Sequence, residues 1–216
     1  MQISTSILSI KENINEKIKL LNDTNTDYIH LDIMDGKFVK NKTRKFNEIV
    51  EDIKETTKLV DVHLMVEDVK KYVDKYALIN PDIITFHVEV DQDIDEMIDY
   101  IKSKNIKVGL AIKPNTDLED LSYYLSKIDL VLVMSVEPGM GGQKFILDME
   151  EKIDELRLLK DAYNYNYIIE VDGGINDKTI LNTLNADLIV VGSFITSSTD
   201  YKNQIKKLKD RIKEYE

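Results

Sequence analysis

The sequence of 216 residues predicts a (β/α)₈ barrel. Short apolar runs alternate with longer amphipathic stretches along the chain, which is the pattern of strands that are each followed by a helix. The runs are almost continuously apolar, as expected of parallel strands that are covered on both faces. No long linker or change in composition interrupts the alternation, so we expect residues 1–216 to form a single barrel domain. A doubly wound open sheet is the alternative, because alternation alone does not show closure.

Eight apolar runs are predicted as strands, at Ile3–Leu8, Tyr28–Asp32, Leu59–Met65, Ile83–His87, Lys107–Ile112, Leu130–Met134, Tyr167–Val171 and Leu188–Val191. Helical patterns follow them, at Asn13–Leu21, Asn47–Thr56, Val69–Ile79, Ile94–Ser103, Leu118–Ser126, Met149–Ala162, Lys178–Leu184 and Lys202–Tyr215. The prolines Pro81, Pro114 and Pro138 all fall between these elements, where the missing N–H donor costs nothing. The number and length of the strands favour the barrel over the open sheet.

Composition and charge exclude several classes of protein. With 43% hydrophobic residues the chain can bury a large core, and its lack of cysteine excludes disulfides and thiol catalysis. The net charge of −11 disfavours binding to nucleic acid and to anionic membrane surfaces. No apolar run reaches the length of a membrane span, and the N-terminus lacks the pattern of a secretory signal. We therefore expect a cytoplasmic protein without nucleic-acid or membrane partners.

Two histidines and two aspartates form a candidate metal site. His30 and Asp32 lie two residues apart in one predicted strand, so both side chains project to the same face. His63 comes from the next strand, and Asp172 follows the seventh. Taken singly, each could be a buried group that is hydrogen-bonded or ion-paired. Together they suggest one divalent cation per chain, and the ligand types do not distinguish Zn²⁺, Fe²⁺, Mn²⁺ and Co²⁺.

Glycine-bearing loops follow the last three predicted strands. In such barrels the active site lies at the carboxyl ends of the strands, and the loops after the seventh and eighth often hold phosphate. Glycine lets backbone N–H groups approach an anion closely. The candidate phosphate and substrate contacts are Gly139, Met140, Gly141, Gly142, Gly173, Gly174, Gly192 and Ser193.

A metal beside a phosphate site indicates chemistry on a sugar phosphate. Asp32 and Asp172 come from strands on opposite sides of the predicted barrel. One could remove a proton from a carbon while the other returns a proton to the opposite face, which would invert that centre. The metal would stabilise the enediolate that forms. This requires one aspartate to be ionised and the other protonated, as two nearby carboxylates can be.

A basic loop lies after the second predicted strand, with Lys37, Lys40, Lys42, Arg44 and Lys45 close together. In an acidic protein such a loop could draw an anionic small molecule toward a nearby pocket. Equally, it could be a solvated loop that keeps the protein soluble.

Several segments together resemble the ribulose-phosphate 3-epimerase family over essentially the whole chain. The most specific are His30-Leu-Asp-Ile-Met-Asp-Gly36 and the long segment from Val133 to Phe145, which contains Glu-Pro-Gly-Met-Gly-Gly. The others are Ser6-Ile-Leu8, His63-Leu-Met-Val66, Gly109-Leu-Ala-Ile-Lys-Pro114, Glu170-Val-Asp-Gly-Gly-Ile175 and Val191-Gly-Ser193.

The resemblance implies a TIM barrel that interconverts D-ribulose 5-phosphate and D-xylulose 5-phosphate. It implies that His30, Asp32, His63 and Asp172 hold the metal, with Asp32 and Asp172 as the acid/base pair and His63 and Asp172 also among the substrate contacts. Ser6, Met34, Met65 and Met134 resemble residues that line the family's pocket, whereas from the residues alone the methionines read as core. We also expect a homo-oligomer. The resemblance gives His87 no metal role, and we interpret it as a hydrogen-bonded histidine of the barrel.

The sequence departs from the family pattern in the basic loop, where Lys40 replaces a proline and Arg44-Lys45 replace a Phe-Gly pair. Proline stiffens a loop, so we predict a more mobile lid here. A six-carbon ketose phosphate such as allulose 6-phosphate is therefore an alternative substrate. Two further alternatives are a Schiff-base lyase that uses Lys113 and a non-catalytic barrel that binds phosphosugars.

Overall fold

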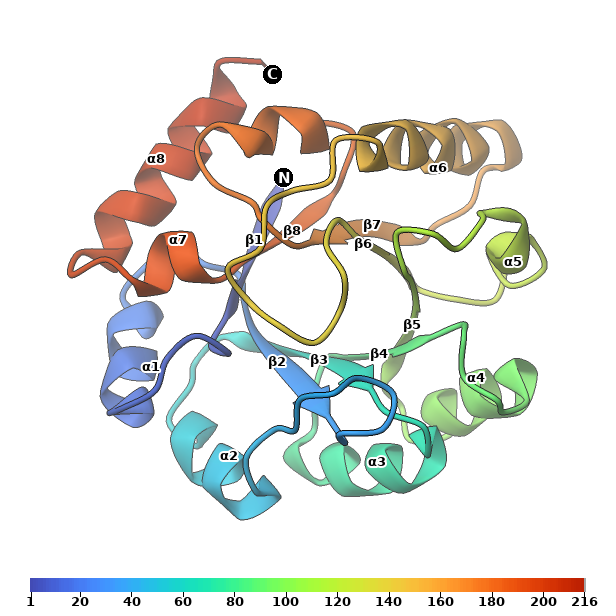
Figure 1. Cartoon of the computed structure of the whole chain (residues 1–216), viewed down its shortest axis with the longest axis horizontal. Helices are drawn as coiled ribbons and strands as arrows, with labels where there is room; N and C mark the ends of the chain where they lie inside the picture. Colours follow the sequence, from blue (N-terminus) through green and yellow to red (C-terminus); the bar gives the residue numbers. More distant parts are fainter. Residues whose placement is uncertain (216) are drawn as a thin grey trace.

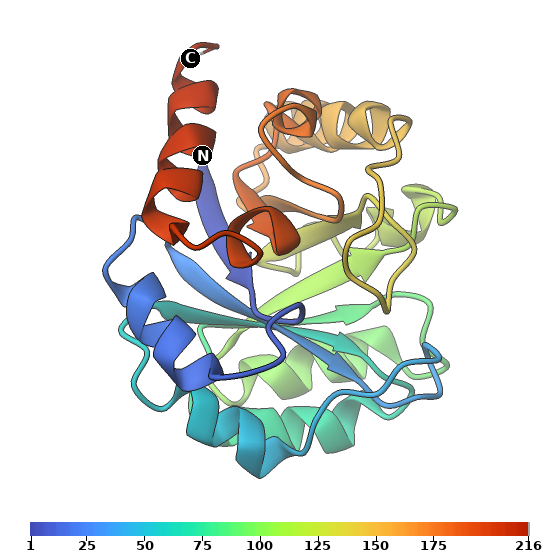
Figure 2. The ribbon, with the colours of Figure 1, turned by 60° about the vertical axis from the view of Figure 1, so that its left-hand side comes forward.

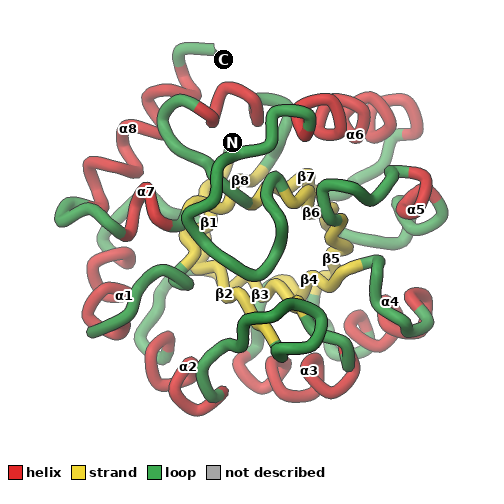
Figure 3. Tube along the Cα trace, in the orientation of Figure 1, coloured by secondary structure: helices red, strands yellow, loops and turns green. Residues whose placement is uncertain are grey.

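A computed structural model of the chain, which describes residues 1–215, forms a closed barrel. In this part of the chain eight parallel strands pair in sequence order, and β1 closes the ring by pairing with β8. Figure 1 looks into the barrel, and Figure 3 shows the strands as an inner ring surrounded by helices. The predicted (β/α)₈ fold is confirmed, and the closure rules out the open sheet.

The strands are β1 (Gln2–Ser6), β2 (Tyr28–Met34), β3 (Leu59–Met65), β4 (Ile83–His87), β5 (Lys107–Ile112), β6 (Leu130–Met134), β7 (Ile168–Asp172) and β8 (Leu188–Val191). The helices are α1 (Ile14–Asn22), α2 (Phe46–Ile53), α3 (Val69–Tyr76), α4 (Ile94–Lys102), α5 (Glu119–Ser122), α6 (Met149–Tyr163), α7 (Ser193–Thr196) and α8 (Tyr201–Lys213). Two 3₁₀ turns complete them, η1 (Ala77–Ile79) and η2 (Thr179–Thr183). Figure 2 shows α8 beside the N-terminal strand β1. The two ends of the chain therefore lie close together.

Most element boundaries differ by one to three residues from the sequence prediction, and three differences have a clear structural form. The first strand ends at Ser6 rather than Leu8, because the Ser6 hydroxyl accepts the N–H of Leu8 and turns the chain. The helix predicted over 118–126 is only the short α5. The helix predicted over 178–184 is the 3₁₀ turn η2, because Asn176 Oδ1 accepts the N–H groups of Lys178 and Thr179 and one turn is too short to sustain an α-helix.

The interior of the barrel is divided into a polar and an apolar half. Strands β1 to β4 and β7 carry buried polar side chains, whereas β5, β6 and β8 contribute to an apolar cluster that includes Ala111, Leu132, Met134 and Leu188. A larger core, made from the outward residues of the strands and the inner faces of the helices, surrounds the barrel. The polar half is costly to bury and therefore marks where function is placed.

Aspartates fasten the amino-terminal face of the barrel. An aspartate directly before every second strand accepts the N–H of the second residue of the preceding strand, at 2.8 to 2.9 Å. These aspartates are Asp27 before β2, Asp82 before β4, Asp129 before β6 and Asp187 before β8. The repetition supplies partners for strand ends and leaves the opposite face free to carry a site.

Candidate active site

The four predicted ligands come together at the carboxyl end of the barrel. Ligand atoms of His30, Asp32, His63 and Asp172 all lie within 4.8 Å of one another. The register explains this, since Asp32 pairs with His63 across β2 and β3, while Asp172 ends β7. His30 Nε2 lies 3.5 Å from Asp32 Oδ1 and 4.0 Å from Asp172 Oδ2, and His63 Nδ1 lies 3.7 Å from Asp32 Oδ1.

The donor set fits a divalent cation. His30 Nε2 and His63 Nδ1 are buried without a hydrogen-bond partner, and both face the carboxylate of Asp32. A buried ring nitrogen without a partner is costly unless something binds it. Two imidazoles and two carboxylates within this span are a suitable ligand set for a borderline transition metal.

The electrostatics of the site separate the two aspartates. Burial raises the pKa of Asp32, but the neighbouring His30 and His63 outweigh it and hold the pKa far below its usual range. Burial and the carboxylate of Asp32 raise the pKa of Asp172 to about 7. In the metal-free protein, the carboxyl of Asp32 is thus ionised near neutrality, whereas that of Asp172 gains its proton as the pH falls through about 7.

Asp61 orients His30 through the ring nitrogen that faces away from the ligand cluster. Sequence analysis did not select Asp61. His30 Nδ1 lies 2.6 Å from Asp61 Oδ2, which also accepts the hydroxyl of Ser4 at 3.2 Å. Glu170 lies in the same fully buried cluster, and burial followed by the charge of Asp61 raises its pKa. Both could have been found by the argument used for His30, because Asp61 and Glu170 stand two residues before His63 and Asp172 on the same faces.

His87 is hydrogen-bonded, as the sequence interpretation had it. Its Nε2 lies 2.9 Å from Nε2 of His63, and its Nδ1 lies 2.9 Å from Glu89 Oε2. Burial lowers the pKa of His87 to about 4, so its imidazole is neutral near pH 7. Glu89 was another residue that sequence analysis did not select.

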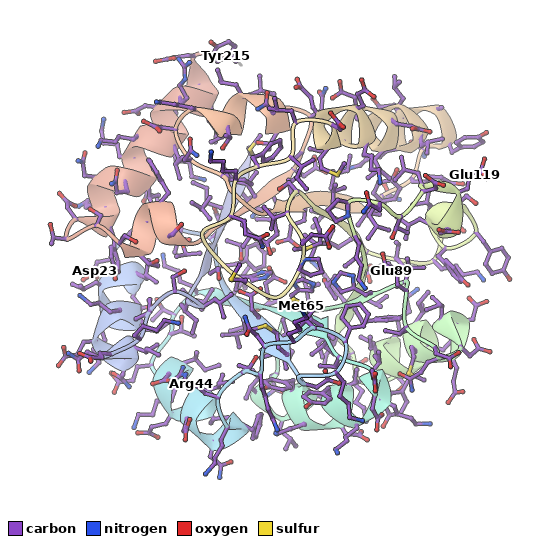
Figure 4. The ribbon with its side chains drawn as sticks, viewed as in Figure 1. Asp23, Arg44, Met65, Glu89, Glu119 and Tyr215 are labelled. Carbon is purple, nitrogen blue, oxygen red and sulfur yellow. The ribbon has the colours of Figure 1, made fainter. Side chains whose placement is uncertain are left out.

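A pocket with about 570 Å³ of empty space opens above the cluster. Its wall includes Asp32 and most of the predicted substrate contacts: Ser6, Met65, Met134, Gly139, Met140, Gly141, Gly142, Asp172, Gly173, Gly174, Gly192 and Ser193. Met34 lies instead at two neighbouring pockets, and His30 and His63 lie beneath the floor with no exposed surface. Figure 4 shows Met65 close to the barrel centre.

Two details fix the shape of this pocket. Ser6 Oγ donates to Asp32 Oδ2 at 2.7 Å, which orients one aspartate. Gly173 and Gly174 have φ of +127° and +66°, and a Cβ there would lie 2.5 Å from Val136 and 2.3 Å from Phe145. Only glycine is accommodated at this turn.

The loops after β2 and β6 meet over the pocket. Asn41 Nδ2 donates to the carbonyl of Gly139 at 2.7 Å, and Val39 packs against Gly139. The basic residues of the first loop are partly paired, since Lys37 contacts Glu67 at 3.4 Å and Arg44 contacts Asp52 at 2.6 Å. Figure 1 shows the loop after β6 crossing in front of the barrel centre. The predicted mobility of the lid stays a prediction.

Comparison with solved structures shows the fold. A 3-hexulose-6-phosphate synthase superposes with a TM-score of 0.68 at 16% identity, covering 98% of this chain and 99% of that one. KGPDC from Streptococcus mutans has a TM-score of 0.68 at 12% identity, covering 99% of this chain and 97% of that one. Within residues 1–215, no helix has both the length and the apolar character to cross a bilayer.

Sequence comparison shows the family. A family model described as Ribulose-phosphate 3 epimerase family matches residues 2–196. The ribulose-phosphate 3-epimerase of Helicobacter pylori is 40% identical over 190 residues, 87% of each chain. That of Buchnera aphidicola is 40% identical over 219 residues, 98% of this chain and 95% of its own. That of Bacillus subtilis is 35% identical over 214 residues, 97% of this chain and 98% of its own. The chain therefore belongs to the ribulose-phosphate 3-epimerase family.

Proposed function

We propose that this enzyme interconverts D-ribulose 5-phosphate and D-xylulose 5-phosphate by moving protons at C3 with Asp32 and Asp172. One observation carries the proposal: the carboxyls of Asp32 and Asp172 line one pocket and come from two different strands, β2 and β7. In the metal-free protein their pKa values are displaced in opposite directions. An ionised and a protonated carboxyl on two sides of a substrate are what inversion by two bases requires. The family membership supports the same reaction.

In this mechanism, the ionised Asp32 removes the C3 proton from one face of the ketose phosphate. Asp172 delivers its proton to the other face, and the two exchange roles in the reverse direction. Ser6 holds Asp32 through the 2.7 Å hydrogen bond, which limits its rotation toward the substrate. The loops after β2 and β6, joined through Asn41 and Gly139, limit access of water.

A divalent cation fits the proposal, with His30, Asp32, His63 and Asp172 as the residues that would hold it. When bound, it would offset the negative charge that develops on the substrate oxygens beside C3. The ligand types do not distinguish Zn²⁺, Fe²⁺, Mn²⁺ and Co²⁺.

We propose that the glycine-bearing loops bind the substrate phosphate. Gly173, Gly174, Gly192 and Ser193 all line the pocket, and Ser193 begins α7. Their backbone N–H groups are suitable donors for an anion. A cytoplasmic location and a homo-oligomeric state stay predictions from the sequence.

Lys113 is poorly placed for the Schiff-base alternative. Its Nζ lies 4.0 Å from the ring centre of Phe38, and the residue lines a separate pocket beside the lid. The allulose 6-phosphate alternative concerns the same chemistry on a longer substrate, so a direct comparison of kcat/KM on both sugars decides it.

The test is epimerase activity of Asp32→Asn and Asp172→Asn on D-ribulose 5-phosphate in deuterated water. The wild type should form D-xylulose 5-phosphate with solvent deuterium at C3, and each variant should lose about 10²–10⁴-fold in kcat. The double variant should lose far less than the product of the single losses, because the two residues act as a unit. Asp177→Asn, at an exposed aspartate, is the matched control.

Metal content must be measured alongside. A variant that retains its metal and keeps kcat within a few-fold of the wild type would remove that aspartate from the mechanism. A wild type that is fully active after chelation would exclude the metal.

A further inference from the structure

His63 can hold a metal in only one of its two neutral tautomers. Its Nδ1 faces the ligand cluster, 3.7 Å from Asp32 Oδ1, and has no hydrogen-bond partner. Its Nε2 lies 2.9 Å from Nε2 of His87. A neutral imidazole has one N–H and one lone pair. Nδ1 is therefore free to bind a cation only when the proton of His63 is on Nε2 and is donated to His87.

His87 has to present a lone pair for this arrangement, and Glu89 provides for it. His87 Nδ1 lies 2.9 Å from Glu89 Oε2, so an ionised Glu89 requires a proton on that nitrogen. Burial raises the pKa of Glu89, but hydrogen bonds from His87, Thr116 and the Lys113 N–H hold it at about 2. With the proton of His87 on Nδ1, its Nε2 accepts from His63.

The surrounding residues hold His63, His87 and Glu89, which form a row of three hydrogen-bonded side chains, in place. Glu89 Oε1 accepts the backbone N–H of Lys113 at 2.7 Å and the hydroxyl of Thr116. The ring of Phe38, from the loop after β2, covers His87 at a centroid distance of 4.8 Å. His63 and His87 have no exposed surface. Water therefore does not compete for either ring. The Glu89 carboxylate accepts at one end of the row, and at the other end Asp32 Oδ1 lies 3.7 Å from Nδ1 of His63, on the side where the cation would bind.

We infer that His87 and Glu89 are positioning residues that fix the tautomer of His63 and thereby direct its Nδ1 lone pair to the metal position. The inference rests on the proposed metal site. The opposite arrangement would place a lone pair of His87 against the Glu89 carboxylate and a proton of His63 at the ligand cluster. Partners of this kind typically change metal affinity by about 10–100-fold.

Glu89→Gln is a sharp test because it should reverse the donor and acceptor in both hydrogen bonds, between residue 89 and His87 and between His87 and His63. Lys113 N–H and the Thr116 hydroxyl both donate to Oε1, so the amide oxygen of the glutamine should occupy that position. Its NH₂ group would then face His87 Nδ1 and donate to it. His87 would carry its proton on Nε2 and donate to His63, whose own proton would be forced onto Nδ1.

Glu89→Ala separates this effect from a merely structural one. Alanine leaves Lys113 N–H and Thr116 without an acceptor, so the metal-free protein should lose thermal stability. It does not impose the wrong tautomer, however. We therefore expect Co²⁺ affinity in the order wild type, Glu89→Ala, Glu89→Gln, with Glu89→Gln about 10–100-fold below the wild type. Glu119→Gln, at an exposed glutamate on α5, is the matched control, and Figure 4 shows both glutamates.

Co²⁺ and Zn²⁺ titration gives the affinities, and ¹H–¹⁵N spectra of the rings give the tautomers. The chain has three histidines, which makes the spectra simple to assign. We expect His87 to change from Nδ1–H in the wild type to Nε2–H in Glu89→Gln. Unchanged tautomers, a Co²⁺ affinity of Glu89→Gln within twofold of the wild type, or weaker Co²⁺ binding by Glu89→Ala than by Glu89→Gln would overturn the inference. A wild type that binds no cation would refute the proposed metal site, and the ring spectra of metal-free protein would still decide the inference.

Discussion

The hydrogen bond between His30 and Asp61 leads to a graded prediction for metal binding. His30 Nδ1 and Asp61 Oδ2 lie 2.6 Å apart, and neither side chain has exposed surface. A hydrogen bond to a charged group is worth about 1.5–3 kcal/mol, roughly twice a neutral one. Asp61→Asn keeps an acceptor for His30 but removes the charge, so we expect a loss of about 1 kcal/mol, or about fivefold in metal affinity.

Asp61→Ala removes the acceptor altogether and leaves a buried N–H of His30 without a partner. We expect about 10–100-fold weaker metal binding and a lower free energy of unfolding. Ser4→Ala is the control, because the Ser4 hydroxyl donates to the same carboxylate oxygen at a longer 3.2 Å and its removal leaves the acceptor of His30 in place. Affinities come from Co²⁺ titration, and stability comes from urea unfolding of the metal-free protein.

Two results would contradict this reasoning. If folded Asp61→Ala bound Co²⁺ within twofold of the wild type, Asp61 would have no influence on the ligand above it. If Asp61→Asn bound as weakly as Asp61→Ala, the charge of Asp61, rather than an acceptor for His30, would carry the effect.

Two further predictions concern the phosphate loops and the pH dependence of stability. Gly192→Val should raise KM for the phosphorylated substrate by at least about tenfold with normal metal content, because Gly192 lines the pocket. A Cβ at this position has its nearest neighbour, in Ser6, at 3.6 Å and therefore meets no clash. An unchanged KM would move the phosphate site elsewhere. For Glu89 the folded pKa of about 2 is below its ordinary 4.5, so its carboxylate stabilises the fold above pH 4.5 and loses this effect as the pH falls toward 2. The difference in unfolding free energy between metal-free wild type and Glu89→Ala should therefore shrink between pH 5 and pH 2, and a constant difference would contradict the low pKa.

The sequence by itself determined the fold class and the four candidate ligands. Apolar runs that alternate with helical patterns predicted the barrel, and the period of two residues in a strand placed His30 and Asp32 on one face. The carboxyl ends of parallel strands meet at one rim, so His63 and Asp172 were expected there as well. These inferences work because strand periodicity and chain direction are local properties.

Only the tertiary structure decided which side chains pair beneath and beside these ligands. The contacts of His30 with Asp61 and of His63 with His87 depend on the register between neighbouring strands and on the rotation of each ring. The contact of Asn41 with Gly139 joins loops that are 98 residues apart in the chain. Closure of the barrel likewise required the pairing of β1 with β8. Such contacts arise from packing between distant segments, and no periodicity in the sequence encodes them.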